Sequence, residues 1–409
     1  MGSVQLHSTE KRCNDRRMKT HSPLTSCRGL PGLSRYCMEI ASLFLLGLLL
    51  LPALQCMAED SPTQDSTWVF TGDLVFARDD HGASLLADGG VLISGGAINN
   101  GLQEIDKAEL YDPATGMWTE VAHLNQARQE HTSTLLNDGR VLVVGGFNFD
   151  DGGRLGSAEI YNPATNLWRY TPHLNDERLE HTTTLLNDGR VLVAGGWGPG
   201  FVTLLRTAEI YNPRTGTWTE TGRMIEPRGF HAAVLLNDGR VLVSGGGAHG
   251  SMLTSEIFDP ATETWTAAAN MQRQHWGHTA TLLDDGSVLI AGGFRVDIRD
   301  PASHTAEVYD PVQNTWTLTG QLNRPRYYHT ATLLPSGQVA VIGGITNTDQ
   351  SPPVETYDPA TGVWTLSGRL NENRAGHSAT LLSDGTILVA AGFGDGLTET
   401  SEIGTFGPP

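Results

Sequence analysis

The chain has 409 residues, of which 18% are charged and 48 are glycine, and its formal net charge at pH 7 is −18. Seven of the 27 basic and three of the 45 acidic residues lie before residue 59, which leaves 20 against 42 in the remainder, a net charge of −22. Such an excess of acid argues against a nucleic-acid partner, because the phosphates would be repelled.

The first 58 residues predict an export signal. Residues 40–54 are apolar throughout, with Arg28 and Arg35 upstream. This run is too short to cross a bilayer, which takes about 20 residues. Ala58 offers the small residue that signal cleavage needs. We therefore expect the mature chain to be secreted, periplasmic or at the cell surface, with no membrane span.

Two alternatives for this segment stay open. Met18 or Met38 is an alternative start, and Cys56 is a candidate lipoprotein anchor, although Gln55 fits the required small residue poorly. The segment also holds every cysteine, so neither disulfides nor thiolate chemistry is expected after it. These cysteines are Cys13, Cys27, Cys37 and Cys56.

One pattern then recurs seven times. Each copy begins with a histidine, and fourteen residues later comes a glycine pair, which is Ala391-Gly392 in the last copy. In six copies a triplet such as Tyr-Asp-Pro follows, with a tryptophan five residues past the proline and the next histidine thirteen residues further on. The histidines are His81, His131, His181, His231, His278, His329 and His377.

Each copy predicts four short strands, a to d. Strand a follows the histidine, a turn at Asp-Gly leads to strand b, and runs such as Ala-Glu-Ile-Tyr and Trp-Thr form strands c and d. One small sheet cannot bury both of its faces, so units repeated every 47 to 51 residues must stack on one another. The predicted fold is all-β, a seven-bladed β-propeller over residues 66–407.

The glycine pair followed by Tyr-Asp-Pro and tryptophan resembles the kelch motif, in the form seen in bacterial exported kelch proteins and in the propeller of galactose oxidase. The resemblance covers residues 68 to about 406. Trp68 opens this region with a lone strand d, and the last copy ends at strand c near Ser401-Glu402-Ile403. We therefore expect the N-terminal strand to complete the last blade and close the circle.

Variation in length is confined to one loop. The step from the glycine pair to the aromatic residue of Tyr-Asp-Pro ranges from 13 to 17 residues, whereas the other two spacings are constant. The b–c loops therefore vary, and variable loops on a rigid frame are the usual place for binding. Their predicted contributions are Phe147, Asn148, Asp150, Asp151, Trp197, Phe201, His249, Arg295, Asp297 and Arg299.

The two residues before each histidine lie on the same face and change from blade to blade. The acids are Asp79, Asp80, Glu130 and Glu180 on blades one to three, and the aromatic residues are Phe230, Trp276, Tyr327 and Tyr328 on blades four to six. The aromatic residues come from adjacent blades at the same point of the crossover. We expect them to form one arc that stacks on the apolar face of a sugar.

Three residues before six of the histidines stands an arginine, and His275 replaces it in blade five. A ring of guanidinium groups at the entry to the innermost strands can bind carboxylates or sulfates through two hydrogen bonds each, and in animal kelch domains the matching arginine often lines the channel mouth. The predicted ligand site therefore includes Arg128, Arg178, Arg228, Arg326 and His275, with Arg228 and Arg326 placed to orient an acidic or sulfated group. The alternative is that each arginine pairs with the glutamate of strand c. These glutamates and the seven histidines are predicted to be structural, with each imidazole bonded to a backbone group.

No cofactor is expected. Histidine and tyrosine together are similar to the copper site of galactose oxidase, but that cofactor also needs a cysteine crosslinked to a tyrosine, and no cysteine follows residue 58. A plain metal site formed by His275, His278 and Tyr328 stays open as an alternative.

Two functions of different classes fit these observations. The first is a monomeric binding propeller outside the cytoplasm that recognises a glycan or a protein partner through its variable face. The second is a carbohydrate-active enzyme (a lyase, epimerase or hydrolase) with Glu130, Glu180 or Asp80 as acid or base. The near-perfect repetition favours binding, since an active site usually breaks symmetry more heavily.

Overall fold

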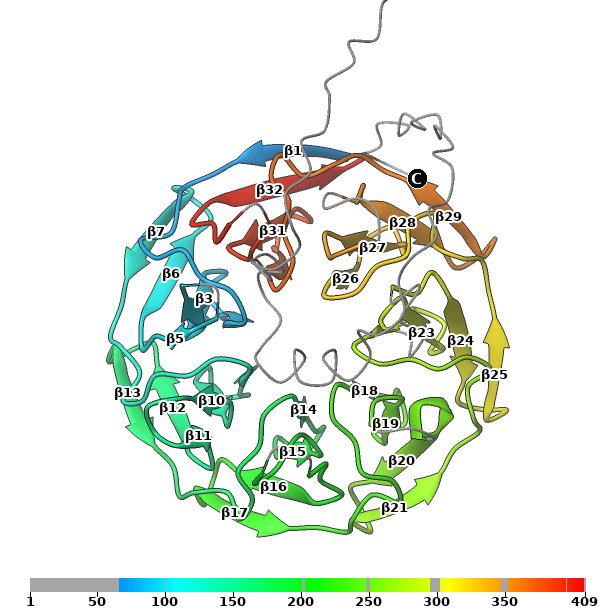
Figure 1. Ribbon diagram of the computed structural model, residues 1–409, viewed down its shortest axis with the longest axis horizontal. Helices are drawn as coiled ribbons and strands as arrows, with labels where there is room; N and C mark the ends of the chain where they lie inside the picture. The colour runs from blue at the N-terminus through cyan, green and yellow to red at the C-terminus, as the bar shows by residue number, and fades with distance from the viewer. Residues whose placement is uncertain are drawn as a thin grey trace, which may run out of the picture. The chain divides into compact units, whose positions relative to one another are not determined.

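The computed structural model describes residues 66–99, 101–200, 203–247, 251–294, 302–346, 352–394 and 396–407. Within these residues seven four-stranded antiparallel sheets follow one another around a central axis, from blue to red in chain order (Figure 1). The predicted all-β, seven-bladed propeller is confirmed. Among the described residues no helix is long and apolar enough to cross a membrane.

Each blade places strand a innermost and strand d outermost. The first three blades are β2 (Gly82–Leu85), β3 (Val91–Ser94), β6 (Ala108–Asp112), β7 (Met117–Glu120); β8 (Thr132–Leu135), β9 (Val141–Val144), β12 (Ala158–Asn162), β13 (Leu167–Tyr170); and β14 (Thr182–Leu185), β15 (Val191–Ala194), β16 (Ala208–Asn212), β17 (Thr217–Glu220). The next two are β18 (Ala232–Leu235), β19 (Val241–Ser244), β20 (Ser255–Asp259), β21 (Thr264–Ala267); and β22 (Thr279–Leu282), β23 (Val288–Ala291), β24 (Ala306–Asp310), β25 (Thr315–Leu318).

The last two blades are β26 (Thr330–Leu333), β27 (Val339–Ile342), β28 (Glu355–Asp358), β29 (Val363–Leu366); and β30 (Ser378–Leu381), β31 (Ile387–Ala390), β32 (Ser401–Phe406), β1 (Ser66–Phe70). The b–c loops of blades one and two form small hairpins, and that of blade four holds one 3₁₀ turn. These elements are β4 (Ala97–Ile98), β5 (Gln103–Glu104), β10 (Phe147–Asn148), β11 (Gly153–Arg154) and η1 (Ser251–Leu253).

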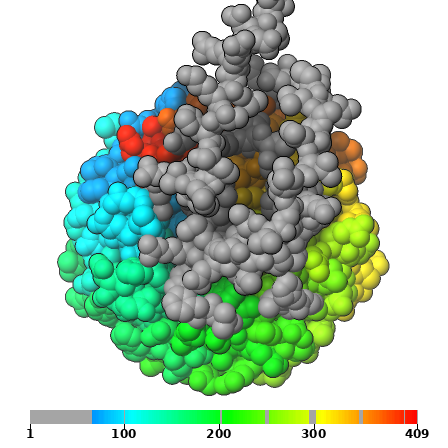
Figure 2. Space-filling view, viewed as in Figure 1, coloured from blue at the N-terminus to red at the C-terminus, as the bar shows by residue number. Residues whose placement is uncertain are grey.

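The hydrophobic core lies between neighbouring blades. In blades two and three, Leu142 and Val144 of β9 cluster with Val191 and Val193 of β15 and with Tyr211 of β16. Equivalent clusters join every other neighbouring pair, including blades seven and one. Figure 2 shows cyan, green and yellow blades touching in turn around the rim. A blade therefore buries its faces only against its neighbours.

The N-terminal strand closes the circle. β1 pairs antiparallel with β32 from Ser66↔Phe406 to Phe70↔Glu402, and the two strands lie side by side in blue and red in Figure 1. Trp68 is buried there and packs edge-on against Phe406. The predicted closure of the last blade by the first strand is confirmed.

The glycine pair fixes the crossover that leads into strand a. Gly95 and Gly96 both have positive φ, at 63° and 97°, where a side chain is strained. A Cβ on Gly96 would also lie 2.6 Å from the carbonyl oxygen of Asp79. Backbone bonds join Asp79 and Ala97 in both directions, at 3.1 and 2.9 Å. The residues before each histidine are thereby held at one defined place.

Candidate functional site

The arginine before each histidine lies inside its blade. Arg178 is fully buried, and its Nη2 lies 2.8 Å from Oε1 of Glu209, while Nη1 donates to the carbonyl of Gly195 at 2.7 Å. Glu209 also accepts from the backbone N–H groups of Asn175 and Asp176, at 2.9 and 3.3 Å. Each carboxylate thus clamps the crossover to strand c.

The same clamp recurs in every blade. The ion pairs are Arg78–Glu109, Arg128–Glu159, Arg228–Glu256, Arg326–Glu355 and Arg374–Glu402. In blade five the buried His275 takes the place of arginine, with Nε2 3.4 Å from Oε1 of Glu307. The structure therefore shows the ion-pair alternative. We leave Arg128, Arg178, Arg228, Arg326 and His275 out of the candidate site, because burial withholds them from a ligand.

The repeated histidines connect neighbouring blades. His231 is buried, and its Nε2 lies 2.9 Å from the hydroxyl of Thr182 in the preceding blade. Burial lowers the pKa of His231 to about 3, so the imidazole is neutral. This geometry agrees with the predicted structural role of the histidine. The hydrogen-bond partner of His231 is, however, the hydroxyl group of Thr182 and not the expected backbone group. His131 instead faces Gly82, which has no hydroxyl.

The residue just before each histidine belongs to a second circle of positions, which we call the mouth ring. Its members are Asp80, Glu130, Glu180, Phe230, Gly277, Tyr328 and Gly376, and all have φ between 49° and 60°. Neighbouring strands a lie side by side around the axis, and these residues directly precede them. The mouth ring therefore surrounds one end of the central channel, on the face of the b–c loops.

Backbone hydrogen bonds tie the mouth ring together. Glu130 N–H donates to the carbonyl of Asp80 at 3.0 Å, and Asp80 N–H donates to that of Gly376 at 3.2 Å. Similar bonds run from Phe230 to Glu180, from Gly277 to Phe230 and from Gly376 to Tyr328. Left-handed backbone at a residue other than glycine costs about 1–2 kcal/mol. Strain of this kind often accumulates at functional sites, and here five such residues meet at one channel mouth.

The acidic half of the mouth ring consists of Asp80, Glu130 and Glu180, all partly exposed. Burial raises the pKa of Asp80 to about 7. Burial first, and then the charges of Glu130 and Asp80, raise the pKa of Glu180 well above its ordinary value. Asp79, which directly precedes Asp80 in the chain, is fully buried. Burial first, and then the charge of Asp80, raise the pKa of Asp79 to about 9. Burial therefore favours the protonated forms of Asp79, Asp80 and Glu180.

The predicted aromatic residues do meet. Phe230 and Trp276 have ring centroids 4.7 Å apart in an edge-on arrangement, and Tyr327 and Tyr328 lie 5.3 Å apart. Phe294 joins the two pairs, with its centroid 5.2 Å from Trp276 and 3.9 Å from Tyr327. We call these five residues the aromatic cluster. Tyr327 is buried, whereas the other four side chains are partly exposed.

Phe294 was not among the predicted ligand-site residues. It is the first residue after the glycine pair of blade five, and it forms a β-bridge with Trp276. The equivalent residues in blades two and three, Phe147 and Trp197, were assigned to the loops on the same pattern. Its position directly after the glycine pair could have revealed it, because the residue at that position also bridges the crossover in blade two, where Phe147 pairs with Gln129.

The other loop residues have mixed outcomes. Asn148 accepts from the backbone of Asp150, and Asp151 accepts from the side chain of Gln126, so these polar groups brace the β10–β11 hairpin. Trp197 is partly exposed and bridges Leu179 and Leu204. Phe201, His249, Arg295, Asp297 and Arg299 lie outside the described residues.

Comparison with known proteins identifies the repeat. A model described as the KLHDC2/KLHL20/DRC7 Kelch-repeats domain matches residues 80–293, more than half of the chain, and a Kelch motif model matches residues 276–323. The chain belongs to the kelch-repeat family. Among curated proteins, no sequence matches the chain significantly.

Two solved structures have the same fold as this kelch propeller. One is a fungal alcohol oxidase of the AA5 family in complex with copper, with 18% identity and a TM-score of 0.65 over 84% of this chain and 76% of that one. The other is YjhT, with 18% identity and a TM-score of 0.54 over 70% of this chain and 97% of that one. Kelch propellers of this kind suit interaction or binding, but the fold does not name the ligand.

The residues of this kelch propeller do not fit a copper centre of the galactose oxidase kind. His275 is buried beside Glu307 and the carbonyl of Gly292, and Nε2 of His278 lies 3.0 Å from the hydroxyl of Ser244. The described residues contain no group of three histidine, cysteine or acidic side chains placed to hold a metal. The alternative metal site of His275, His278 and Tyr328 therefore has no support from their contacts.

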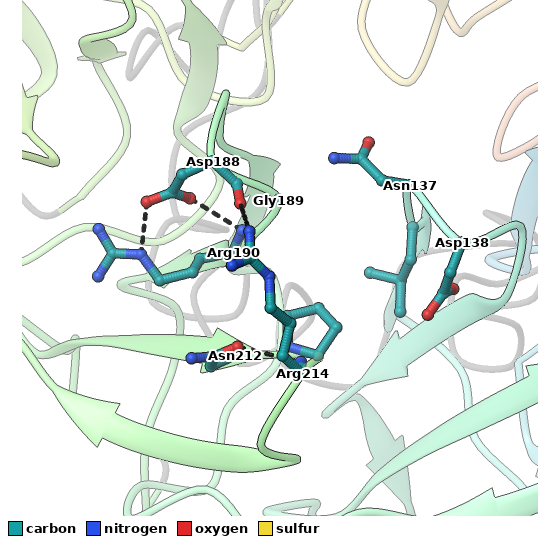
Figure 3. A pocket seen from close by; sticks show the side chains of 9 residues that line it. Asn137, Asp138, Asp188, Gly189, Arg190, Asn212 and Arg214 are labelled. Atoms are coloured by element: carbon teal, nitrogen blue, oxygen red, sulfur yellow. Dashed lines mark hydrogen bonds and ion pairs between the residues drawn. The ribbon is translucent and has the colours of Figure 1, made fainter.

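Two polar cavities open on the opposite face, between the a–b and c–d turns. The first, of about 480 Å³, has Asn137 and Asp138 on one side and Arg190 and Arg214 on the other (Figure 3). Arg190 binds Asp188 through its Nε at 2.7 Å. A second, of about 750 Å³, lies between blades four and five. Their charged residues belong to turns that repeat along the chain, so we interpret these cavities as part of the frame.

Proposed function

We propose that this protein is an extracytoplasmic kelch propeller that binds a glycan at the mouth ring. The observation that supports this most strongly is the aromatic cluster, in which four partly exposed aromatic side chains meet at the channel mouth. Location outside the cytoplasm rests on the predicted signal in residues 1–58.

Two physical properties of the mouth ring favour a sugar ligand. Aromatic side chains stack on the apolar faces of sugars, and rings already held in a rigid frame lose little conformational entropy on binding. The polar groups beside the cluster, in the acidic half of the mouth ring, can accept and donate hydrogen bonds to hydroxyl groups. An apolar platform with convergent polar groups is a typical small-ligand site.

The blades themselves suggest how to test the cluster without unfolding it. The residue equivalent to Trp276 in blade three is Leu179. The residues equivalent to Tyr328 in blades five and seven are the glycines Gly277 and Gly376. The double variant Trp276→Leu/Tyr328→Gly should therefore fold, yet lose retention on immobilised polysaccharides by tenfold or more. Tyr170→Ala, which removes an exposed aromatic group on the outer strand β13, is the matched control.

Two results would count against the proposal. If the double variant is retained as well as the Tyr170→Ala control on every polysaccharide that the wild type binds, the aromatic cluster is not the site. If the wild type is retained on none of a broad polysaccharide panel but captures a defined protein through the same residues, the alternative of a protein partner takes its place.

One observation favours a second candidate, a carbohydrate-active enzyme. Asp80, with its pKa raised to about 7, stands next to Glu130 across a hydrogen-bonded step of the mouth ring. A carboxyl group that holds its proton at neutral pH can act as a general acid beside a second carboxylate. New reducing or unsaturated ends on incubation with polysaccharides, lost in Asp80→Asn, would establish catalysis.

A further inference from the structure

Trp197 extends the aromatic surface into blade three. Its indole ring covers Gly229, the residue directly before Phe230, because a Cβ built on Gly229 would lie 2.9 Å from Nε1 and 3.0 Å from Cδ1 of Trp197. Gly229 is not among the residues with positive φ, so its backbone conformation does not require glycine. What requires glycine here is the space that the indole ring of the neighbouring blade occupies.

The same relation between neighbouring blades holds within the aromatic cluster. Trp197 is the first residue after the glycine pair of blade three, and Phe294 is the first after that of blade five. Phe294 lies against Tyr327, two residues before the histidine of the next blade, with ring centroids 3.9 Å apart. Gly229 is the equivalent of Tyr327 in blade four. The indole ring of Trp197 therefore takes the place of a missing side chain in line with the aromatic cluster.

Trp197 offers a second stacking surface beside that of Trp276. Both side chains are partly exposed, and β-bridges to Leu179 and Leu204 fix the backbone of Trp197. A ring held in this way loses little conformational entropy when a ligand binds. Trp276 contacts the ring of Phe230, whereas Trp197 covers the residue before it. The two indole rings thus flank the same dipeptide, and each can stack on one unit of a sugar chain.

The charges near this surface favour an uncharged sugar. Arg228 and Arg326 were predicted to orient an acidic or sulfated group of the ligand. Both are fully buried, with ion pairs of 2.8 Å to Glu256 and 2.6 Å to Glu355. Neither guanidinium group can therefore bind an anionic ligand, and the net charge of −22 after residue 58 would repel one.

The stereochemistry of the sugar narrows the class further. A pyranose whose ring substituents are all equatorial presents only axial C–H groups on its two faces, and such faces suit the π-systems of aromatic rings. Chains of β-1,4-linked glucose or xylose have this form. An axial hydroxyl group would stand between the sugar and the indole ring.

We propose that the glycan is an uncharged β-1,4-linked chain of glucose or xylose, and that Trp197 and Trp276 stack on two successive units of it. This inference rests on the proposed function and deepens it, because it names the ligand class and adds a residue of blade three to the site. The smallest ligand that fills the site is then a chain and not a single sugar.

The first measurement compares matched sugars on the whole protein by calorimetry at pH 7. The probes are the tetramers of β-1,4-linked glucose and xylose, the single sugars glucose and xylose, and the tetramer of β-1,4-linked glucuronic acid. This last probe differs from the glucose tetramer in its C6 carboxylates. We expect a neutral tetramer to bind at least about tenfold more tightly than its single sugar and than the glucuronic acid tetramer.

The second measurement removes the stacking surface of Trp197. Ile345 and Ala375 stand at the equivalent positions between blades six and seven, so the double variant Trp197→Ile/Gly229→Ala copies a pair that a blade interface already accommodates. Its affinity for the neutral tetramer should fall about tenfold. Phe149→Ile, which removes an exposed aromatic group from a loop of blade two, is the matched control and should bind as the wild type does.

A third variant separates loss of binding from loss of folding. Trp197→Phe introduces the residue that blade two has at this position, Phe147, and retains a smaller aromatic ring. Its affinity for the tetramer should lie between those of the wild type and the double variant. The melting temperature of each variant, followed by circular dichroism, shows whether it is folded.

The outcomes separate the two proposals. If a single sugar or the glucuronic acid tetramer binds as tightly as a neutral tetramer and depends on Trp276, the glycan site stands and this inference is overturned. It is also overturned if the double variant binds the tetramer as the Phe149→Ile control does, or if another polysaccharide binds while neither neutral tetramer does. If no polysaccharide binds at all, the proposed function itself fails.

Discussion

Two positions on the crossover before strand a differ in how far their residue type repeats and in whether the side chain is buried. One lies three residues before the repeat histidine, and the other lies directly before it. The first is arginine in six blades and is fully buried against a strand-c glutamate, as in Arg178–Glu209. The second ranges from Glu180 through Phe230 to Gly277 and borders the channel. The second position keeps its left-handed backbone in all seven blades, whatever its side chain. The difference teaches that the residue type repeats where the blade itself supplies the partner of the side chain, and varies where the side chain borders the channel.

Burial shifts the titration of these two regions in opposite directions. It lowers the pKa of His231 in the frame to about 3, and it raises the pKa of Asp80 at the mouth to about 7. Both shifts disfavour charge, because the low-dielectric surroundings penalise an ionised group. The frame therefore loses stability in acid, whereas the mouth loses it as the pH rises.

The largest expected effect tests whether blade seven is equivalent to the others. A chain that begins at Arg78 lacks β1, so β32 loses its partner and an edge of the seventh sheet is exposed. We expect this chain to lose its cooperative thermal transition, whereas a chain that begins at residue 59 should keep it. If the shorter chain melts as high as the longer one by circular dichroism, closure by β1 is not needed for stability.

The next effect concerns the buried pairs. Arg178→Met leaves Glu209 as an uncompensated buried charge, which costs about 3–5 kcal/mol of unfolding free energy. Arg214→Met at an exposed turn should change stability by about 0.5 kcal/mol or less. Urea denaturation of both variants provides the measurement. Equal losses would mean that the frame does not depend on the clamp.

A pH series then separates the frame from the mouth. The unfolded chain binds more protons than the folded one at His231 between pH 6.5 and 3, so stability falls in acid by up to about 1.4 kcal/mol per pH unit for each such histidine. Asp80 has the opposite effect on the free energy of unfolding. Its pKa is higher in the folded than in the unfolded chain, so its contribution to stability falls as the pH rises.

For this reason Asp80→Asn should stabilise the protein at pH 8 by on the order of 1 kcal/mol, discounted because the carboxyl group is partly exposed. The gain should vanish below about pH 3, where the wild-type carboxyl group is protonated in both the folded and the unfolded state. A gain that is constant with pH would show that the charge of Asp80 is not its cause.

The smallest effect examines the strained backbone of the mouth ring. At φ 55°, Phe230→Gly relieves strain that Phe230→Ala retains, so the glycine variant should be the more stable by about 1 kcal/mol. At Thr183 in strand β14 the opposite order is expected. There Thr183→Ala should be more stable than Thr183→Gly by about 0.5–1 kcal/mol of unfolding free energy. The same order at both sites would contradict the left-handed geometry.

The sequence by itself determined the architecture. Seven histidines at a period of 47 to 51 residues, fixed spacings to the glycine pair and the tryptophan, and the lone strand at Trp68 together required a closed propeller of seven blades. It also placed the aromatic residues of blades four to six at one position of the crossover. These inferences succeeded because strand periodicity and turn chemistry are local, and each was repeated seven times.

Only the tertiary structure decided which polar side chains are available. Arg128 and Glu130 lie two residues apart and look equally suited to a ligand, yet the first is buried in its blade and the second borders the channel. Phe294 joined the aromatic cluster through a bridge to Trp276, eighteen residues away. Burial and contact between distant residues depend on how the blades pack, and that packing is not encoded in the spacing of any single motif.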